Sequence, residues 1–177
     1  GFDMYCDLLK QAVAQLKQQP PQEYKVARLD IDTDAYIPAD YIHLESARID
    51  VHHRIAAARD ETALMAIRAE LADRFGPVPQ MVDNLVEMQD IRLKAGILGA
   101  AGVAWRRGRL ELSDIQVGAA QRSALEAAGH KFVYYAQRRI LAFWPPDPEG
   151  GLPVVKGALN AIIDSLLTSA ADSQAHA

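Results

Sequence analysis

Hydrophobic and polar positions follow two different periods along the chain, and the changes of period divide it into elements. In residues 2–18, apolar side chains recur at three- and four-residue steps, which predicts an amphipathic helix. The run QQPPQ ends this helix, because proline cannot continue the hydrogen-bond ladder. In residues 24–38, apolar and polar side chains alternate singly, so this segment is predicted to be a half-exposed strand with acids on its wet side.

Three helices joined by short turns are predicted over about residues 44–98, of which the first covers residues 44–59. Asp60 is suited to be the N-cap of the second helix, and Gly76 is suited to be its C-cap. Two prolines follow Gly76 and separate the second helix from the third, which is predicted over residues 80–98.

After Gly99 the pattern changes to short strands. Two strands are predicted around Arg107-Gly108, in VAWRRGRLELSD, and two more in KFVYYAQRRILAFW. Helices are predicted over residues 118–128 and 153–170. The fold class is therefore α+β, with a helical run packed against short antiparallel strands and a mixed second half.

Charge is unevenly distributed and restricts the class of partner. The first hundred residues contain 16 acidic and 11 basic residues, net −5, and the remaining 77 contain 7 acidic and 8 basic residues, net +1. An acidic surface repels phosphate, so general nucleic-acid binding is disfavoured and a basic partner surface is the better match. The single cysteine excludes an internal disulfide, and no apolar run reaches the length of a membrane span. We expect a soluble, cytoplasmic protein.

No catalytic, metal or cofactor site is predicted. A phosphate-binding loop needs glycines and a lysine before a helix, and the glycine-containing GAAGVAW has no lysine. His52 and His53 are neighbours on a predicted helix, where adjacent side chains point about 100° apart, so surface positions are more plausible than a shared metal. Cys6 has no histidine near it in sequence, which favours a buried thiol over a nucleophile.

A basic cluster with one aromatic residue follows residue 100: Trp105, Arg106, Arg107 and Arg109, with two more arginines at positions 138 and 139. Aromatic side chains interleaved with arginines can bind single-stranded nucleic acid. The competing interpretation is a hairpin whose turn carries solvated arginines.

Two carboxylates, Glu70 and Asp73, lie three residues apart on the helix predicted after Asp60. On a helical wheel they fall on the solvent side, flanked by two alanines, while one arc faces the core: Leu64, Ile67, Leu71 and Phe75. Such a shallow acidic patch suits docking against arginines, whose planar guanidinium groups bind carboxylates well. The competing interpretation is an ordinary helix surface with an internal pair between Glu70 and Arg74.

Three segments, GFDMYCDLLKQAV, AYIPADYI and RIAAARDETALMAIRAELADRFGPVP, occur in this order. Together they resemble the C-terminal end of the bacterial transcription-repair coupling factor family, over residues 1–16 and 35–99, whereas VHHRI departs from the family pattern. The resemblance implies a fragment of a longer protein. Residues 1–20 would be a helix leading from the motor, and residues 21–170 the terminal domain with sub-lobes of about 21–100 and 101–170. Residues 171–177 would be a disordered tail.

The resemblance also implies a function. Family members recognise RNA polymerase stalled at DNA damage, displace it by ATP-driven translocation and recruit the repair protein UvrA. The terminal domain is expected to have no catalytic role and no direct RNA polymerase contact. It is expected to dock on the UvrB-like N-terminal module of the same chain, to cover the surface that UvrA binds, and to restrain the motor.

In this interpretation Glu70 and Asp73 form half of an interdomain ionic latch that faces arginines of the N-terminal module. Exposed ion pairs contribute only about 0.2–1 kcal/mol each, so several together would hold a switch near balance. Two alternatives stay open: a nucleic-acid-binding appendage that uses the cluster around Trp105, and an independent small enzyme.

Overall fold

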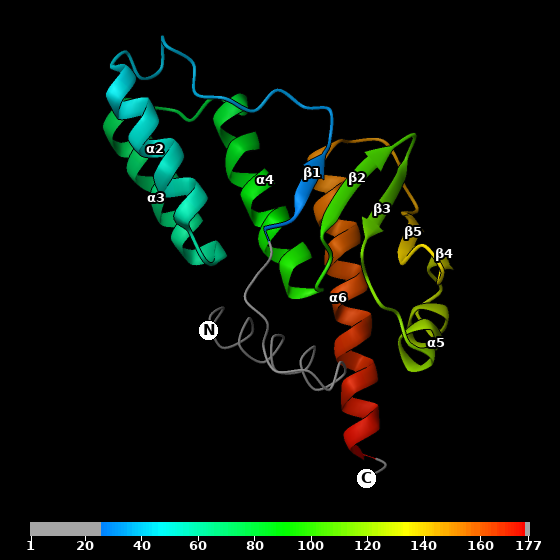
Figure 1. Ribbon diagram of the computed structural model, residues 1–177. Helices are drawn as coiled ribbons and strands as arrows, with labels where there is room; N and C mark the ends of the chain where they lie inside the picture. The colour runs from blue at the N-terminus through cyan, green and yellow to red at the C-terminus, as the bar shows by residue number, and fades with distance from the viewer. Residues whose placement is uncertain (1–25, 176–177) are drawn as a thin grey trace.

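The computed structural model describes residues 26–175, and of residues 168–175 it describes the backbone only. The helix expected over residues 2–18, as part of the linking segment 1–20, and Cys6 lie outside the described residues. The described part contains five helices and a five-stranded mixed sheet (Figure 1). The predicted α+β class is confirmed.

The sheet has the strand order β1–β2–β3–β5–β4. Its strands are β1 (Arg28–Asp30), β2 (Gly102–Arg106), β3 (Arg109–Ser113), β4 (Lys131–Tyr135) and β5 (Ile140–Trp144). Strand β1 pairs with β2 in parallel, and every other pairing is antiparallel. The predicted hairpin turn joins β2 to β3, where Arg107 and Gly108 both have positive φ, as a two-residue hairpin turn of this hand requires.

The helices are α2 (Glu45–Ala57), α3 (Glu61–Phe75), α4 (Gln80–Ile97), α5 (Ala119–Ala127) and α6 (Leu152–Ala175). Both caps predicted for α3 are present, since Asp60 accepts a hydrogen bond from the Ala63 amide at 2.8 Å and Gly76 has a φ of 89°. Within residues 26–175, no helix combines the length and the apolar character that a membrane crossing needs.

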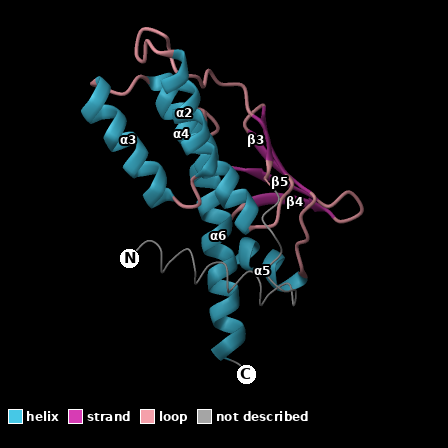
Figure 2. Ribbon diagram, turned by 60° about the vertical axis from the view of Figure 1, so that its left-hand side comes forward, coloured by secondary structure: helices cyan, strands magenta, loops and turns pink. Residues whose placement is uncertain are grey.

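Two hydrophobic clusters form the core, and α4 belongs to both. Its first half packs against α2 and α3 through Val82 and Val86, which defines a helical lobe (Figure 2). Its second half packs with the sheet, α5 and α6, which defines a sheet lobe, through residues that include Ile91 and Ala95. The sequence predicts sub-lobes divided near residue 100, but in the structure the two cores meet within α4 because β1 and the end of α4 pack with later residues.

A partly buried ionic network lies where the two lobes meet. Asp90 of α4, whose side chain is 5% exposed, binds the ammonium groups of Lys94 at 2.7 Å and of Lys156 at 3.1 Å. Lys156, on α6, also binds Glu87 at 3.1 Å, and Glu61 of α3 lies 3.7 Å from it. The network thus joins α3, α4 and α6.

The described chain differs from the sequence prediction at its two ends. The segment predicted as a strand over residues 24–38 pairs only at residues 28–30, because the chain beyond Asp30 leaves β2 and crosses toward α2 (Figure 1). Exposed and less exposed side chains still alternate as far as Ile37, although the residues after Asp30 pair with no described strand. Helix α6 continues to Ala175, into the segment predicted to be a disordered tail, because alanines there favour helix.

Candidate interaction site on helix α3

Helix α3 places the two predicted site residues on the solvent side of the helical lobe. Leu64, Ile67 and Leu71 are buried on its inner face, as the helical wheel predicts. Asp73 is exposed, whereas the side chain of Glu70 is 38% exposed. A partner approaching this side of α3 would therefore meet both carboxylates.

The C-terminal half of α3 is held in position by polar contacts as well as by its apolar face. The hydroxyl of Tyr41 donates to the carbonyl oxygens of Leu71 at 3.0 Å and of the C-cap Gly76 at 3.1 Å. Arg68 binds Asp83 of α4 through two hydrogen bonds, of 2.6 and 3.2 Å, in the bidentate geometry that favours arginine. The surface that carries Glu70 and Asp73 is consequently a fixed one.

Glu70 already has two partners within the domain. Its predicted pair with Arg74, four residues later, is confirmed at 3.3 Å, and Arg54 of α2 binds its other carboxylate oxygen. The hydrogen bond donated by Arg54 has the largest effect on the pKa of Glu70, and the positive charges of Arg54 and Arg74 add to it. Although partial desolvation opposes them, the pKa of Glu70 lies below its ordinary value of 4.5.

The surface around Glu70 is less acidic than the sequence predicts. Two arginines, Arg54 and Arg74, offset the charge of Glu70, and the carboxylate of Asp50 also acts on Arg54. The sequence missed Arg54, because its contact with Glu70 joins residues 16 apart and depends on how α2 packs on α3. Asp73 has no ion pair among the residues that the structure describes.

Titration of Glu70 provides a direct test of this arrangement. Followed by NMR of its side-chain carboxyl carbon, the wild-type midpoint is expected below 4.5, because the charged form is stabilised by Arg54. The Arg54→Ala variant should raise the midpoint toward 4.5. Because the pKa of Glu70 is lower in the folded state than in the unfolded state, its pair with Arg54 stabilises the fold above the unfolded-state pKa. This stabilisation is lost as the pH falls through the folded-state pKa. A midpoint that stays unchanged in the variant would contradict the pairing.

The basic cluster predicted after residue 100 does not form one surface. Trp105 and Arg106 are consecutive on β2, so their side chains lie on opposite faces of the sheet, and Trp105 packs against the core. Arg106 pairs with Asp30, and Arg109 pairs with Glu111. The period of two along β2 is the signal that separates Trp105 from Arg106, and the hairpin register places Arg109 opposite Arg106. The aromatic ring that lies near Arg109 is Trp144, with the guanidinium 5.8 Å from the ring centroid.

The two adjacent histidines and the possible metal ligands do not form a site within residues 26–175. His52 and His53 are exposed on α2. Among the described residues, no group of three or more histidine, cysteine, aspartate or glutamate side chains has a metal-binding arrangement. The candidate functional site is therefore the solvent side of α3 that includes Asp73, and it is a surface for binding rather than for catalysis.

Comparison with known proteins now decides the family. The family model of the TRCF domain matches residues 31–122, more than half of the chain. The chain belongs to the TRCF domain family. This confirms the resemblance found in the sequence, and the matched region of this TRCF domain includes α2, α3, α4 and the β2–β3 hairpin.

Two similar proteins are the transcription-repair-coupling factors of Staphylococcus haemolyticus and Myxococcus xanthus. Each is 33% identical to the TRCF domain chain, over 116 and 121 residues respectively, and each alignment covers 64% of this chain. The chain spans 10% of the length of each of these relatives.

A solved structure extends the comparison to the fold. The crystal structure of the C-terminal domain of a transcription-repair coupling factor is similar, with a TM-score of 0.66 at 20% identity. The similarity covers 82% of this chain and 94% of that one. At this identity the likeness shows the fold alone, and the fold includes the second half of this TRCF domain chain as well as the matched region.

Proposed function

We propose that this TRCF domain is a non-catalytic regulatory domain of an ATP-dependent transcription-repair coupling factor. In the whole protein, which removes stalled RNA polymerase from damaged DNA and recruits excision repair, the domain docks on the UvrB-like N-terminal module. Docking covers the surface that UvrA binds and restrains the motor. The observation that carries this proposal is Asp73, an exposed carboxylate without an ion pair in the described residues, on a helix that packing and hydrogen bonds hold in place.

The pairing of Glu70 gives the proposed latch a mechanism for exchange. Arg54 and Arg74 hold Glu70 in the free domain, and arginines of the N-terminal module would compete with them during docking. Because both local pairs are partly exposed, each contributes little, so exchange of partners costs little free energy. Asp73 supplies the first attraction, since it has no ion pair to lose within the described part of the chain.

Charge reversal at Asp73 tests the proposal. Binding of the 177-residue chain to the separately produced N-terminal module is measured by isothermal titration calorimetry at low and moderate salt. Asp73→Arg is expected to weaken binding by about tenfold, because one attraction of up to about 1 kcal/mol becomes a repulsion of similar size. The wild-type affinity is expected to fall with added salt, and UvrA is expected to compete.

Two sets of variants make the test specific. Glu126→Arg makes the same change of charge at an exposed position on α5, in the sheet lobe, and is expected to leave binding unchanged. Arg54→Ala and Arg74→Ala release Glu70 and are expected to strengthen docking. Unchanged affinity and unchanged salt dependence in Asp73→Arg would exclude the latch.

A further inference from the structure

One face of the sheet is uncovered in the described part of the chain. Helices α4, α5 and α6 pack against the other face, and the open face points toward the viewer in Figure 1. The strand register places one row of side chains straight across this open face, from Asp30 through Ala104, Glu111 and Ala142 to Val133. The row passes from charged side chains over β1–β3 to apolar ones over β5 and β4.

Strand β5 has the composition of a strand that is covered on both faces. Leu141 and Phe143 point into the core, while Ile140, Ala142 and Trp144 belong to the open face. An antiparallel strand with one solvated face usually alternates apolar and polar side chains, whereas a continuous apolar run is typical of a strand buried on both sides. Apolar side chains on the solvated side of a sheet indicate a surface that another element covers.

The neighbouring edge strand extends this apolar strip. Val133 and Tyr135 of β4 lie opposite Ala142 and Ile140, on the same open face. Their side chains are 42% and 47% exposed. The β4–β5 half of the open face therefore has an apolar strip next to solvent.

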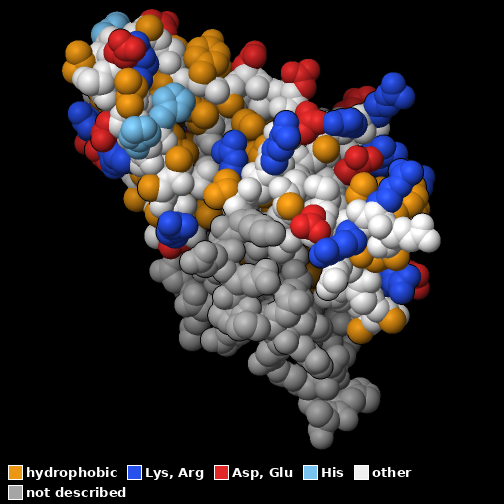
Figure 3. Space-filling view, in the orientation of Figure 1, with side chains coloured by type: hydrophobic (Ala, Val, Ile, Leu, Met, Phe, Trp, Pro, Cys, Tyr) orange, Lys and Arg blue, Asp and Glu red, His pale blue; other side chains and the backbone are white. Residues whose placement is uncertain are grey.

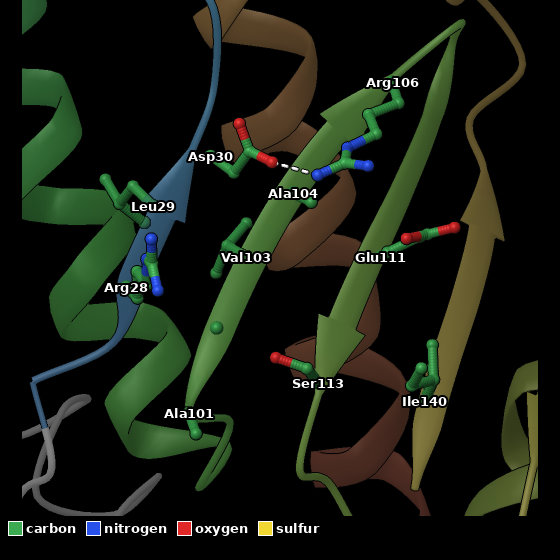
Figure 4. A pocket seen from close by; sticks show the side chains of 11 residues that line it. Arg28, Leu29, Asp30, Ala101, Val103, Ala104, Arg106, Glu111, Ser113 and Ile140 are labelled. Carbon is green, nitrogen blue, oxygen red and sulfur yellow. Dashed lines mark hydrogen bonds and ion pairs between the residues drawn. The ribbon is translucent and has the colours of Figure 1, made fainter. Parts of the chain in front are cut away.

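The β1–β3 half of the open face is hollowed and carries charges of both signs. A shallow hollow of about 550 Å³ lies there between the side chains of β1 and β5 (Figure 4). Gly102 and Ser113 form part of its floor, and the Ser113 hydroxyl oxygen occupies the space that a Cβ on Gly102 would need, 2.4 Å away.

The charges around the hollow leave a cation available. The carboxylates of Asp30 and Glu111 are each paired with an arginine, Arg106 and Arg109 respectively. Arg28 lines the hollow, is exposed, and has no ion pair within the described residues. The pair between Asp30 and Arg106 is more than 60% exposed on both sides, so Arg106 can exchange its partner at small cost. Figure 3 shows several basic side chains over this part of the molecule.

The dimensions of the two halves suit a helix better than a nucleic acid. Neighbouring strands lie about 4.8 Å apart, so β2 and β5, two spacings apart, are separated by roughly 10 Å, which matches one helix about 10–12 Å wide that lies along the strands. Nucleic-acid binding needs free aromatic faces and a cationic groove. Here the Trp144 ring has the Arg109 guanidinium and the Lys131 ammonium within 6 Å of its centroid, and two carboxylates line the hollow.

We propose that the open face of the sheet binds an amphipathic helix of a partner polypeptide, one that has an apolar stripe and an acidic flank. The apolar stripe packs on the β4–β5 strip, which includes Val133 and Tyr135. The acidic flank lies over the hollow and binds Arg28 and Arg106. This surface is in the sheet lobe, separate from the α3 site in the helical lobe, so the TRCF domain has two separate docking surfaces.

The test is an NMR titration of the 177-residue chain with two designed helical peptides of about 18 residues, or five turns. The peptides share one leucine stripe, and their flanks carry glutamate in one and lysine in the other. The glutamate peptide is expected to shift the amide resonances of Gly102, Ala104 and Val133. Arg28→Glu is expected to weaken this binding by about tenfold, because an attraction becomes a repulsion. Arg122→Glu, which makes the same change on exposed α5, should have no effect.

Further variants and probes decide between the occupants. Val133→Asp changes a side chain that is 42% exposed, a kind of position where substitutions usually have little effect on stability. This variant is also expected to weaken binding of the glutamate peptide. Four outcomes would each overturn the proposal. The lysine peptide could bind as well as the glutamate peptide, or neither peptide could bind. The surface could instead bind oligothymidylate, or form a dimer that Val133→Asp dissociates. Asp73→Arg should leave the peptide titration unchanged, so the two docking surfaces can fail separately.

Discussion

Replacing Leu64 by alanine is expected to lower the free energy of unfolding of the whole TRCF domain by about 2–5 kcal/mol. Leu64 is 1% exposed in the helical lobe, where it packs in the cluster that also contains Val82 of α4. Its truncation removes apolar contacts and leaves a cavity that the neighbouring helices cannot fully close.

Both tryptophans lie in the other lobe, which makes this loss informative about domain organisation. Trp105 packs against the sheet-lobe core and Trp144 ends β5. Because α4 contributes to both cores, the urea transition followed by tryptophan fluorescence is expected to shift by the full amount. A lower protection of α3 amides in hydrogen exchange, with an unchanged fluorescence transition, would mean that the lobes unfold separately. Met65→Ala, one residue later and 52% exposed, is the matched control and should change stability by less than about 0.5 kcal/mol.

Asp90→Ala is expected to destabilise the domain by about 3 kcal/mol, because it removes the buried carboxylate that two largely buried lysines share. Lys94, 11% exposed, loses its contact of 2.7 Å and retains only Glu61 at 3.9 Å. Lys156 loses its contact of 3.1 Å with Asp90. Urea denaturation measures the effect.

Two comparisons separate charge from packing in this network. Asp90→Asn retains the shape and one hydrogen-bond acceptor, so its loss should be smaller than that of Asp90→Ala. Asp73→Ala removes an exposed carboxylate near a helix C-terminus and should be neutral or slightly stabilising. A loss in Asp90→Ala no larger than in Asp73→Ala would show that the network contributes nothing to the junction of the lobes.

Much of the fold could be predicted from signals that act within a few residues. The second helix of the run was predicted between Asp60 and Gly76, and the structure confirms both caps. The hairpin at Arg107-Gly108 was predicted for a similar reason, because a tight turn with positive φ at both positions is a local property. The pairing of the segment after Tyr24 was overestimated, since alternation shows which residues are exposed but not how long the neighbouring strand is.

The candidate site was only partly predictable. The pair between Glu70 and Arg74 follows from helical spacing, and the structure confirms it. The pair between Arg54 and Glu70 does not, because it depends on how two helices pack. The separation of Trp105 from Arg106 follows from the period of two along a strand, whereas nearness in sequence alone groups them.

The sequence by itself determined where helices and turns begin and end, which residues face a core, and to which family the chain belongs. Only the tertiary structure decided the strand order, the balance of charge around Glu70 and the composition of the open face of the sheet. The physical reason is range. Caps, turns and periodicity act over one or two turns of chain, whereas the contact between Arg106 and Asp30 joins residues 76 apart and exists only when packing brings their strands together.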